Sequence, residues 1–474
     1  MHIISMNRYL LIIFFLGAHS VFAQKKFSVQ QLREDIELYK KVADQLHPGF
    51  LYQNYANEVN DVFENIKNNL TDSLTITDFF KKFNVLVQSY GDLHTYASYK
   101  KQYSELKYAL PFSAYSSDKK IWVTHSYNSS LIPGDEIISI NEKSVSSIID
   151  EMTKYTINPD RAINPTNVFE IRHTFTVLYG AYFNLSETAD LTIMRDGKLL
   201  RLNIQQLKQG EKGFKETSSF NHIVKQIYKT NDEEIQWQVI DSVKSVYLKI
   251  HSFDSFIKHM KTEKRIFNYL AENNTRNLII DVRDNPGGNY MLAGFLIEYI
   301  ADKPFYLVDS SIIIKKNKIE LDKKLIKQYT RYRFGLTKDE KRNIYFLKTY
   351  KFKPRKKHNY NGKVVLLINA QSMSTASILA GYFKNNGNAV IIGEETGNNY
   401  CAFCAGGKIM FELPNSRMRA QIPLNLLYME VNEKNNSCKN GVIPDIEILE
   451  SINDRINNRD IQLLKAIETI KSLK

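Results

Sequence analysis

Cysteine is scarce in this sequence: there are three, Cys401, Cys404 and Cys438, close together near the C-terminal end. No histidine lies near them in sequence, so a zinc site there would lack its fourth ligand. The Cys401–Cys404 pair has the spacing of a redox motif but not the thioredoxin-like βαβ surroundings. In an oxidising compartment, one disulfide and one spare thiol is the usual result. We predict a structural bridge from Cys438 to Cys401 or Cys404, and no metal site.

The sequence also lacks a long apolar run. The apolar stretch Tyr9–Ala18 has ten residues, whereas a membrane-spanning helix needs about 20. Arg8 precedes this stretch and Val21–Ala23 follows it, which is the arrangement of a secretory signal peptide over residues 1–23. No cysteine follows the stretch, which argues against a bacterial lipid anchor. We expect an exported protein, periplasmic or secreted, with no stable membrane anchor; an uncleaved N-terminal anchor is the alternative.

Negative charge is in the minority, with 51 Asp and Glu against 64 Lys and Arg and a formal net charge of +13. The densest basic cluster, Lys351–Lys357, has no stacking motif around it, and export argues against a nucleic-acid partner. A solvated basic loop is the better interpretation. Apolar residues are plentiful, at 43% hydrophobic and 12% aromatic. This composition excludes a disordered chain, and the roughly 450 residues after the signal peptide suggest two to four domains.

Residues 24–105 have the apolar spacing of helices and predict an N-terminal helical domain. The i, i+3, i+4, i+7 pattern occurs in Val29–Leu46, Ala56–Leu70 and Ile76–Tyr90. His47-Pro48-Gly49 ends the first helix, because a residue before proline avoids the helical conformation. The last helix leads into Gly91-Asp92-Leu93-His94-Thr95.

Residues 106–206 change to a period of two, which is typical of strands. The predicted strands are Ile121–Val123, Glu136–Ile140 and Leu191–Arg195. Ile132–Asn141 resembles the glycine-aspartate turn and following strand of a PDZ module, and Asp190–Ile204 resembles its closing hairpin. The resemblance implies a PDZ-like domain with a longer helical segment than the minimal module needs. An ordinary β-rich domain without a peptide groove is the alternative. Residues 207–235 are polar and predict a linker.

Residues 236–450 alternate strands with helices, which predicts βαβ units and a largely parallel sheet with active groups at strand ends. The predicted strands cover 245–250, 278–282, 364–368 and 389–392, and the predicted helices cover 257–270 and 290–300. Residues 315–356 form a charged insertion. Residues 451–474 predict a C-terminal helix.

Ser374 lies between a predicted strand and a predicted helix. Val364–Ala370 is a continuous apolar run typical of a buried strand, and Ile378–Asn386 has helical periodicity. A serine at such a turn exposes its hydroxyl, with the N–H groups of the helix start behind it. Ser374 is therefore a candidate nucleophile. The alternative is a simple helix N-cap.

Three further segments accompany Ser374. Leu278–Asn289 is a buried strand that runs into the paired glycines Gly287 and Gly288. Paired glycines let the backbone approach a ligand closely and leave N–H groups available, as an oxyanion site requires. Ile391–Gly397 follows the Ser374 helix, and Gly441–Ile446 lies near the C-terminus.

In this order and spacing, the segments resemble the tail-specific (C-terminal processing) serine peptidase family, over about residues 25–450 and most strongly over 278–446. The resemblance implies an α/β fold: a crotonase-like protease core over 236–450, with an N-terminal helical domain and an inserted PDZ-like β-rich domain. It implies that Ser374 is the nucleophile. It also implies that the N–H groups of Thr375 and of Gly287 or Gly288 form the oxyanion hole, and that no cofactor is needed.

The general base departs from the best-known members of that family. They use a lysine in the loop after the Gly-Glu-x-Thr motif, where this chain has Asn399, and asparagine cannot take a proton from serine. Lys408 is the next lysine, nine residues further along. A second branch, resembling the tricorn core peptidase, takes a histidine from the N-terminal side, and Gly91–Thr95 matches that segment. His94 is therefore the candidate base, since neutral imidazole accepts and returns a proton near neutral pH.

The sequence leaves open which acid orients the base. The tricorn-like branch has a serine just before its histidine, where this chain has Leu93, and it uses a glutamate from the C-terminal side. Glu430 and Glu433 precede the Gly441–Ile446 segment and are candidates. Asp92 is the third candidate.

These features predict an exported serine endopeptidase acting on protein or peptide substrates through an acyl-enzyme on Ser374, with His94 as general base. The PDZ-like domain would hold an extended peptide at a sheet edge through its C-terminal tail. The rival prediction is a catalytically degenerate member that binds peptides or another ligand without cleaving them. The oligomeric state is open.

Overall fold

The computed structural model describes residues 25–52, 55–100, 106–156, 160, 169–183, 185–219, 234–316, 320–431 and 440–472. The predicted signal peptide over 1–23, Glu433 and Cys438 lie outside these residues. Among the described helices, none is both long and apolar enough to cross a lipid bilayer.

The largest sheet has the strand order β12-β13-β14-β18-β19-β22. Its strands are β12 (Ile235–Ile240), β13 (Ser245–Ile250), β14 (Asn277–Asp281), β18 (Lys363–Ile368), β19 (Val390–Gly393) and β22 (Ile446–Glu447). β12 is antiparallel to β13, and every other neighbouring pair is parallel. The four strands predicted from apolar runs are confirmed to within one residue.

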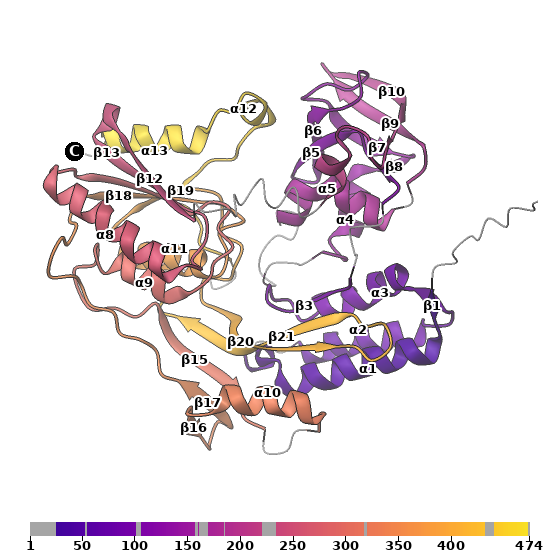
Figure 1. Cartoon of the computed structure of the whole chain (residues 1–474), viewed down its shortest axis with the longest axis horizontal. Helices are drawn as coiled ribbons and strands as arrows, with labels where there is room; N and C mark the ends of the chain where they lie inside the picture. Colours follow the sequence, from indigo (N-terminus) through magenta and orange to yellow (C-terminus); the bar gives the residue numbers. More distant parts are fainter. Residues whose placement is uncertain are drawn as a thin grey trace, which may run out of the picture.

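Helices cover both faces of this sheet (Figure 1). They are α8 (Phe256–Glu272), α9 (Tyr290–Ile297) and α11 (Thr375–Asn386) on one face, and α13 (Ile461–Ser472) on the other. Alternate β14 residues point to opposite layers: Leu278 and Ile280 belong to the core with the three helices, whereas Ile279 packs with Ala466 of α13. Because both faces are buried, these strands have continuous apolar sequences.

A second sheet has the order β16-β17-β15-β21-β20. Its strands are β15 (Val308–Ile314), β16 (Thr337–Asp339), β17 (Ile344–Leu347), β20 (Ala402–Glu412) and β21 (Arg419–Met429). The short strand β3 (Tyr96–Ser98) from the N-terminal part pairs with β21. The charged insertion over 315–356 contains α10 (Lys323–Arg333) as well as β16 and β17.

The N-terminal helices lie against this second sheet (Figure 1). They are α1 (Val29–Leu46), α2 (Ala56–Asn68) and α3 (Ile76–Gln88), with a 3-10 turn η1 (Pro48–Leu51) and a β1–β2 pair (Lys26–Phe27, Leu74–Thr75). α1 begins with a reciprocal capping box between Ser28 and Gln31. The ring of Tyr39 in α1 stacks on Phe411 of β20, with centroids 6.3 Å apart. The three predicted helices are confirmed, the last two ending two residues early.

An inserted β-rich unit has an antiparallel sheet in the order β10-β9-β7-β6-β5, so β5 is an edge strand. The sheet consists of β5 (Phe112–Ser117), β6 (Lys120–Ser126), β7 (Glu136–Ile140), β8 (Lys143–Ser144), β9 (Thr188–Arg195) and β10 (Lys198–Gln205). Its helices are α4 (Val145–Met152) and α5 (Phe169–Tyr182). The segment predicted as a linker contains β11 (Leu207–Lys208), paired with β4 (Tyr108–Ala109), and α6 (Phe214–Ser218).

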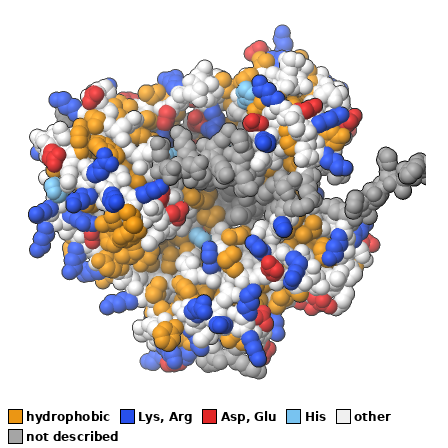
Figure 2. All heavy atoms as spheres, viewed as in Figure 1, with side chains coloured by type: hydrophobic (Ala, Val, Ile, Leu, Met, Phe, Trp, Pro, Cys, Tyr) orange, Lys and Arg blue, Asp and Glu red, His pale blue; other side chains and the backbone are white. Residues whose placement is uncertain are grey.

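The C-terminal segment, predicted as one helix over 451–474, forms α12 (Ile452–Ile456) and α13. Arg283, just after β14, fixes the connection between them through hydrogen bonds to both carboxylate oxygens of Asp460, each 2.7 Å. Lys and Arg side chains are distributed over the lobes visible in Figure 2 and do not gather in one basic patch on that face.

Candidate functional site

Ser374 follows β18 and directly precedes α11, at the carboxyl edge of the central sheet. Its backbone has φ 51° and ψ −116°, a left-handed conformation that is uncommon outside glycine. Such strain is typical of residues held for a functional reason. The side chain makes no capping hydrogen bond to the helix. Ser374 thus occupies the N-cap position of α11, but its side chain does not cap the helix.

The neighbouring serines are engaged in structural hydrogen bonds. Ser372 Oγ donates to the Val282 carbonyl at 2.8 Å and accepts from Asn369 N–H at 3.0 Å. Ser377 Oγ pairs with Thr396 Oγ1 at 3.0 Å. Both are buried, whereas Ser374 is partly exposed and its Oγ has no hydrogen bond to any other described residue. Ser374 is the serine of this segment whose hydroxyl remains available for chemistry.

The glycine turn after β14 packs directly on Ser374. A Cβ atom at Gly287 would lie 2.6 Å from Ser374 Cβ and 2.9 Å from Thr375 N. A Cβ atom at Gly288 would lie 2.4 Å from the Phe253 carbonyl oxygen. Both glycines also have positive φ, 103° and 132°. Only glycine fits at either position, so the pair brings the backbone of the turn against the nucleophile.

The N–H groups around Ser374 differ in availability. Gly287 N–H donates to Asn285 Oδ1 at 2.8 Å. Thr375 is the first residue of α11, where an N–H has no acceptor within the helix. Within the described part of the chain, neither Thr375 N–H nor Gly288 N–H has a hydrogen-bond acceptor. A hydrogen bond of 2.7 Å from Thr375 Oγ1 to the Gly288 carbonyl holds the two segments together.

His94 is held at the edge of the second sheet. Its N–H donates to Asp92 Oδ1 at 2.8 Å, and its carbonyl accepts from Gln421 Nε2 of β21 at 3.0 Å. The imidazole stacks on Phe403 of β20, with ring centroids 6.0 Å apart and an angle of 10°. These contacts fix the backbone and the ring plane of the candidate base.

Burial lowers the pKa of His94 below its usual value. The negative charge of Asp92 and a backbone hydrogen bond at Cys404 oppose this shift, while Lys408 adds to it. The Nδ1 atom is buried and has no hydrogen-bond partner among the described residues. A neutral imidazole with an unused nitrogen can accept a proton. No hydrogen bond between the described residues joins Ser374 Oγ to His94, and such contacts are often long without substrate.

Asp160 links the nucleophile segment to the base segment. This buried carboxylate accepts from Leu93 N–H at 3.3 Å, from Asn398 Nδ2 at 3.1 Å and from Asn399 N–H at 2.8 Å. Asn398 Oδ1 in turn accepts the N–H of Ser374. A residue of the inserted unit thus connects the residue before His94 with the nucleophile itself.

Asn399, at the position where a lysine base is expected, has a structural role. Its Oδ1 accepts from the N–H groups of Cys401 and Ala402, at 2.9 and 3.2 Å. The side chain is buried and caps the start of β20. Lys408 is exposed on β20, and its positive charge lowers the pKa of His94.

The three candidate orienting acids occupy different places. Asp92 lies next to His94, but its carboxylate binds the His94 backbone N–H and not the ring. Glu430 is exposed at the end of β21, where its carbonyl accepts from Asn385 Nδ2. Glu433 lies outside the described residues. Of the cysteines, Cys401 is disulfide-bonded, Cys404 is a buried free thiol, and Cys438 is again outside the described residues.

One cluster of metal-ligand type occurs in the described ranges, formed by His47, Asp92 and Cys404, whose ligand atoms lie within 4.8 Å of one another. Gly49 N–H donates to His47 Nδ1 at 3.1 Å, so the ring proton is on Nε2, which faces Asp92 Oδ2 at 2.7 Å. A protonated nitrogen has no lone pair for a metal. Burial and the nearby carboxylates also raise the pKa of Cys404, which disfavours the thiolate. The geometry fits a hydrogen-bonded pair better than a metal site.

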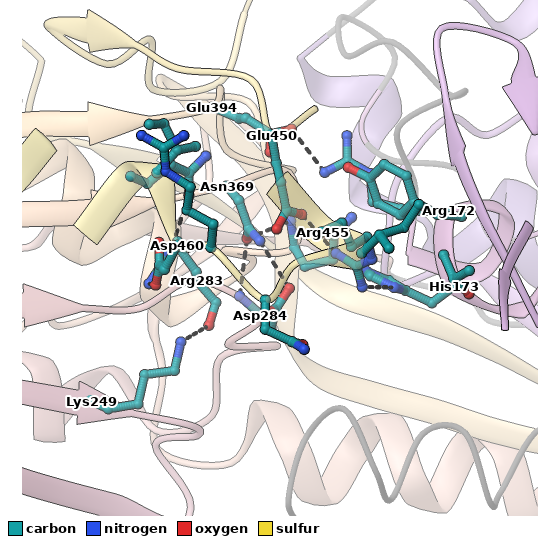
Figure 3. Close-up of a pocket in the computed structure, with 18 residues that line it drawn as sticks. Arg172, His173, Lys249, Arg283, Asp284, Asn369, Glu394, Glu450, Arg455 and Asp460 are labelled. Atoms are coloured by element: carbon teal, nitrogen blue, oxygen red, sulfur yellow. Dashed lines mark hydrogen bonds and ion pairs between the residues drawn. The ribbon is translucent and has the colours of Figure 1, made fainter. Parts of the chain in front are cut away.

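A cavity of about 640 Å³ lies between the inserted unit, the central sheet and the C-terminal segment (Figure 3). Arg172 of α5 enters it and forms a buried ion pair of 2.8 Å with Glu394, just after β19. Arg455 of α12 contacts His173 Nδ1 at 3.3 Å and lies over the ring of Tyr115, 4.3 Å from its centroid. The opposite wall includes residues of the loop that leads to Ser374, among them Asn369. The cavity therefore borders the Ser374 loop.

Comparison with known proteins gives a family match and similar solved structures. Residues 244–448 match the profile of peptidase family S41. The solved structure of mature CPAF complexed with lactacystin is similar, with a TM-score of 0.64 and 15% identity over 94% of this chain and 98% of that chain. A crystal structure of mature CPAF has a TM-score of 0.62 at 14% identity over 94% of this chain and 97% of that chain. A point mutant of CPAF has a TM-score of 0.65 at 14% identity, covering 94% and 98%. These likenesses show the fold.

A search of curated proteins gives no match. The family match covers the segment that contains the glycine turn, Ser374 and the Gly-Glu-x-Thr loop. The fold around it is mixed α/β and is similar to that of the solved CPAF structures. Residues 244–448 are thus a peptidase family S41 domain, and this match supports a serine-type peptidase.

Three residues of the site could not be identified from the sequence. Asp160 lies in the helical part of the inserted unit, and its partners Asn398 and Asn399 are more than 200 positions away. Asn398 looked like part of a polar loop. Gln421 lies in β21, a strand absent from the predicted elements, although the alternation of polar and apolar residues there is typical of a strand.

We expect Gly287→Ala to damage both activity and stability. The added Cβ would overlap Ser374 Cβ at 2.6 Å, and φ of 103° is unfavourable for alanine. Activity should fall about 100-fold or more, because the oxyanion donors shift, and unfolding should be easier by about 1–3 kcal/mol. Steady-state kinetics and denaturant unfolding measure the two effects. Gly197→Ala is the matched control for φ alone, since its φ is 74° and no atom lies within 4 Å of its Cβ position; equal activity loss in both variants would contradict the steric argument.

Burial raises the pKa of Asp160 to about 7, with Asp92 adding to the shift. The unfolded chain releases this proton at lower pH, so between the two pKa values the folded state binds more protons and stability falls as pH rises. Between pH 5.5 and pH 8.5 this group should lower the free energy of unfolding by about 2 kcal/mol. Asp160→Asn should remove that part of the pH dependence in urea unfolding, whereas Asp118→Asn, on the surface, should keep it. Equal slopes for wild type and Asp160→Asn would refute the assignment.

Proposed function

We propose that this protein is an exported serine endopeptidase that cleaves protein or peptide chains through an acyl-enzyme on Ser374, with His94 as general base. The observation that carries the proposal is the arrangement at Ser374. A strained backbone presents an available hydroxyl, the glycine turn packs against Ser374, and the N–H groups of Thr375 and Gly288 have no acceptors in the described chain. A domain that only binds peptides has no need of this combination.

In the proposed reaction, His94 takes the proton of Ser374 Oγ as the oxygen attacks the scissile carbonyl. The N–H groups of Thr375 and Gly288 donate to the oxyanion of the tetrahedral intermediate. His94 then returns the proton to the leaving amine, and the acyl group stays on Ser374 as an ester. A water molecule, deprotonated by His94, hydrolyses this ester and restores the serine.

The base assignment rests on three contacts. Asp92 and Gln421 fix the backbone of His94, and Phe403 stacks on its ring. Lowering of the pKa by burial keeps the imidazole neutral and able to accept a proton at neutral pH. Asn399 cannot serve, because amide groups have no basic nitrogen, and its oxygen is occupied by two backbone N–H groups.

Substrate would enter through the inserted unit, which we propose to be PDZ-like and inserted into a crotonase-like core. β5 is an edge strand and α5 lies beside it. An extended peptide added along such an edge has its backbone groups satisfied by the strand. Tyr115 of β5 and Arg172 of α5 both line the 640 Å³ cavity that borders the Ser374 loop. The cavity would thus receive the part of a bound chain that approaches the nucleophile.

The test uses the full mature protein. A serine-directed acylating probe should label it, and mass spectrometry of the digest should place the label on Ser374. An unfolded protein substrate should be cleaved to peptides. Cell fractionation should find the protein outside the cytoplasm; retention inside the cytoplasm would refute export while leaving the peptidase proposal intact.

The second candidate function is peptide binding without cleavage. It is favoured by one observation, the absence of a Ser374–His94 hydrogen bond between the described residues. Binding of unfolded chains together with neither labelling nor product formation would support this candidate and reject the peptidase.

A further inference from the structure

His47 and Asp92 form a buried pair behind the His94 segment. His47 is fully buried and Asp92 is 5% exposed. Nε2–H of His47 donates to Asp92 Oδ2 at 2.7 Å, and the hydroxyl of Thr95 donates to the same oxygen. The other oxygen of Asp92 accepts the N–H of His94. One carboxylate thus receives three donors, two of them from the segment that carries the candidate base.

The orientation of the His47 ring is itself fixed. Its Nδ1 accepts from Gly49 N–H at the start of η1, which places the ring proton on Nε2. The ring lies among aromatic side chains, with centroids 4.9 Å from Tyr90 and 5.9 Å from Phe50. The His47 ring is fully buried, so bulk solvent does not reach it to compete for the hydrogen bond to Asp92.

The three donors keep Asp92 ionised. Burial alone would raise its pKa, but the contacts with His47 and Thr95 reverse this and lower it. The resulting negative charge raises the pKa of His94 against the effect of burial. A charge that favours imidazolium is what a general base needs from an orienting acid in acyl transfer.

We propose that His47 is a positioning residue that keeps Asp92 ionised and fixed in place, and that Asp92 stabilises the protonated form of His94. No glutamate among the described residues contacts His94 to play this part. This proposal rests on the proposed role of His94. Asp92 acts through space and through the backbone N–H, since its oxygens do not bind the ring. The pair also fixes the position of the His94 segment relative to α1, because His47 is the C-cap of that helix.

Other charged or titratable groups also face the His94 segment. Lys408 of β20 lowers the pKa of His94. Asp160 of the inserted unit accepts the N–H of Leu93. Cys404 of β20 stays a neutral thiol, because burial and the charges of Asp92 and Asp160 raise its pKa. Of the acids, Asp92 is the one that raises the pKa of His94.

The experiment compares Asp92→Asn, His47→Leu and His47→Gln with the wild-type full-length protein. The glutamine amide can still donate to Asp92, whereas leucine cannot. The His94 imidazole is titrated by NMR with ¹³C-labelled histidine, its signal assigned by its loss in His94→Ala. Asp92→Asn should lower the His94 pKa by about one unit, and His47→Leu should do so in part. His47→Gln should restore most of the wild-type value.

The kinetic readout follows the same shift. The acid limb of the kcat/KM profile should move to lower pH by about one unit in Asp92→Asn, and kcat should fall about 10- to 100-fold with KM little changed. A merely structural role would lower the folded fraction without moving the His94 pKa. An unchanged His94 pKa in Asp92→Asn, or equal values in His47→Leu and His47→Gln, would overturn the proposal. A stoichiometric metal ion in the purified protein would also overturn it, because Nε2 would then be a ligand.

The NMR titration needs no turnover, so the two proposals fail separately. If the wild type cleaves nothing but the His94 pKa moves as expected, the proposed function fails and the electrostatic pairing stands. If the wild type is active and the pKa does not move, the pairing fails and the peptidase stands.

Discussion

Ser374→Ala should abolish turnover while leaving the fold intact. The reaction loses its nucleophile, and removing the serine of a comparable catalytic group costs up to about 10⁶-fold in kcat. Stability should change little, because the hydroxyl makes no capping bond and is partly exposed. The effect is measured as the rate at which peptides are released from an unfolded protein substrate. Labelling by the acylating probe should disappear in parallel.

Ser377→Ala is the matched control for this variant. It lies one turn further along α11 and loses a buried hydrogen bond to Thr396. It should be less stable by about 1 kcal/mol and yet keep most of its activity. If Ser377→Ala lost as much activity as Ser374→Ala at equal folded fraction, Ser374 would no longer be distinguished as the nucleophile.

His94→Ala should lower kcat by about 10³-fold or more, with a smaller change in KM. Without a base, Ser374 must give up its proton to water, and general base catalysis typically contributes about 10²–10⁴-fold. The ring also loses its stacking on Phe403, so the unfolding transition has to be measured alongside the rate. Full activity in a folded His94→Ala protein would exclude His94 as the base.

Lys408→Ala tests the remaining cationic candidate. Its side chain is exposed, and its charge lowers the pKa of His94. If His94 is the base, removing this charge should leave kcat within about twofold and shift the acid limb slightly to higher pH. A loss of activity as large as that of His94→Ala would instead make Lys408 the base.

The central sheet could be predicted from sequence because its strands are buried on both faces. A run such as that ending at Ile368 is continuous and apolar, and glycines mark the turns at the strand ends. The hairpin of β20 and β21 was missed for a physical reason. Gly406 and Gly407 interrupt β20 where its register with β21 shifts, so the local pattern is broken.

The site could be predicted only in part, because only some of its residues carry a signal in the local sequence. Ser374 and the glycine turn are local in sequence and carry local signals. The network around Asp160 depends on contacts between distant segments, and no local pattern indicates it. His47 was recognised only as the end of a helix, because its role depends on Asp92, 45 positions further along.

The pairing of β3 with β21 has a consequence for biosynthesis. The Gln421 side chain that holds the His94 carbonyl lies 327 positions later in the chain. A contact of such long sequence separation forms late, after both segments have been synthesised. On the proposed mechanism, a growing chain carries its base long before its nucleophile, and neither is in place until the last strands pair. The polypeptide would therefore remain inactive throughout synthesis and would become a peptidase only on completing its fold.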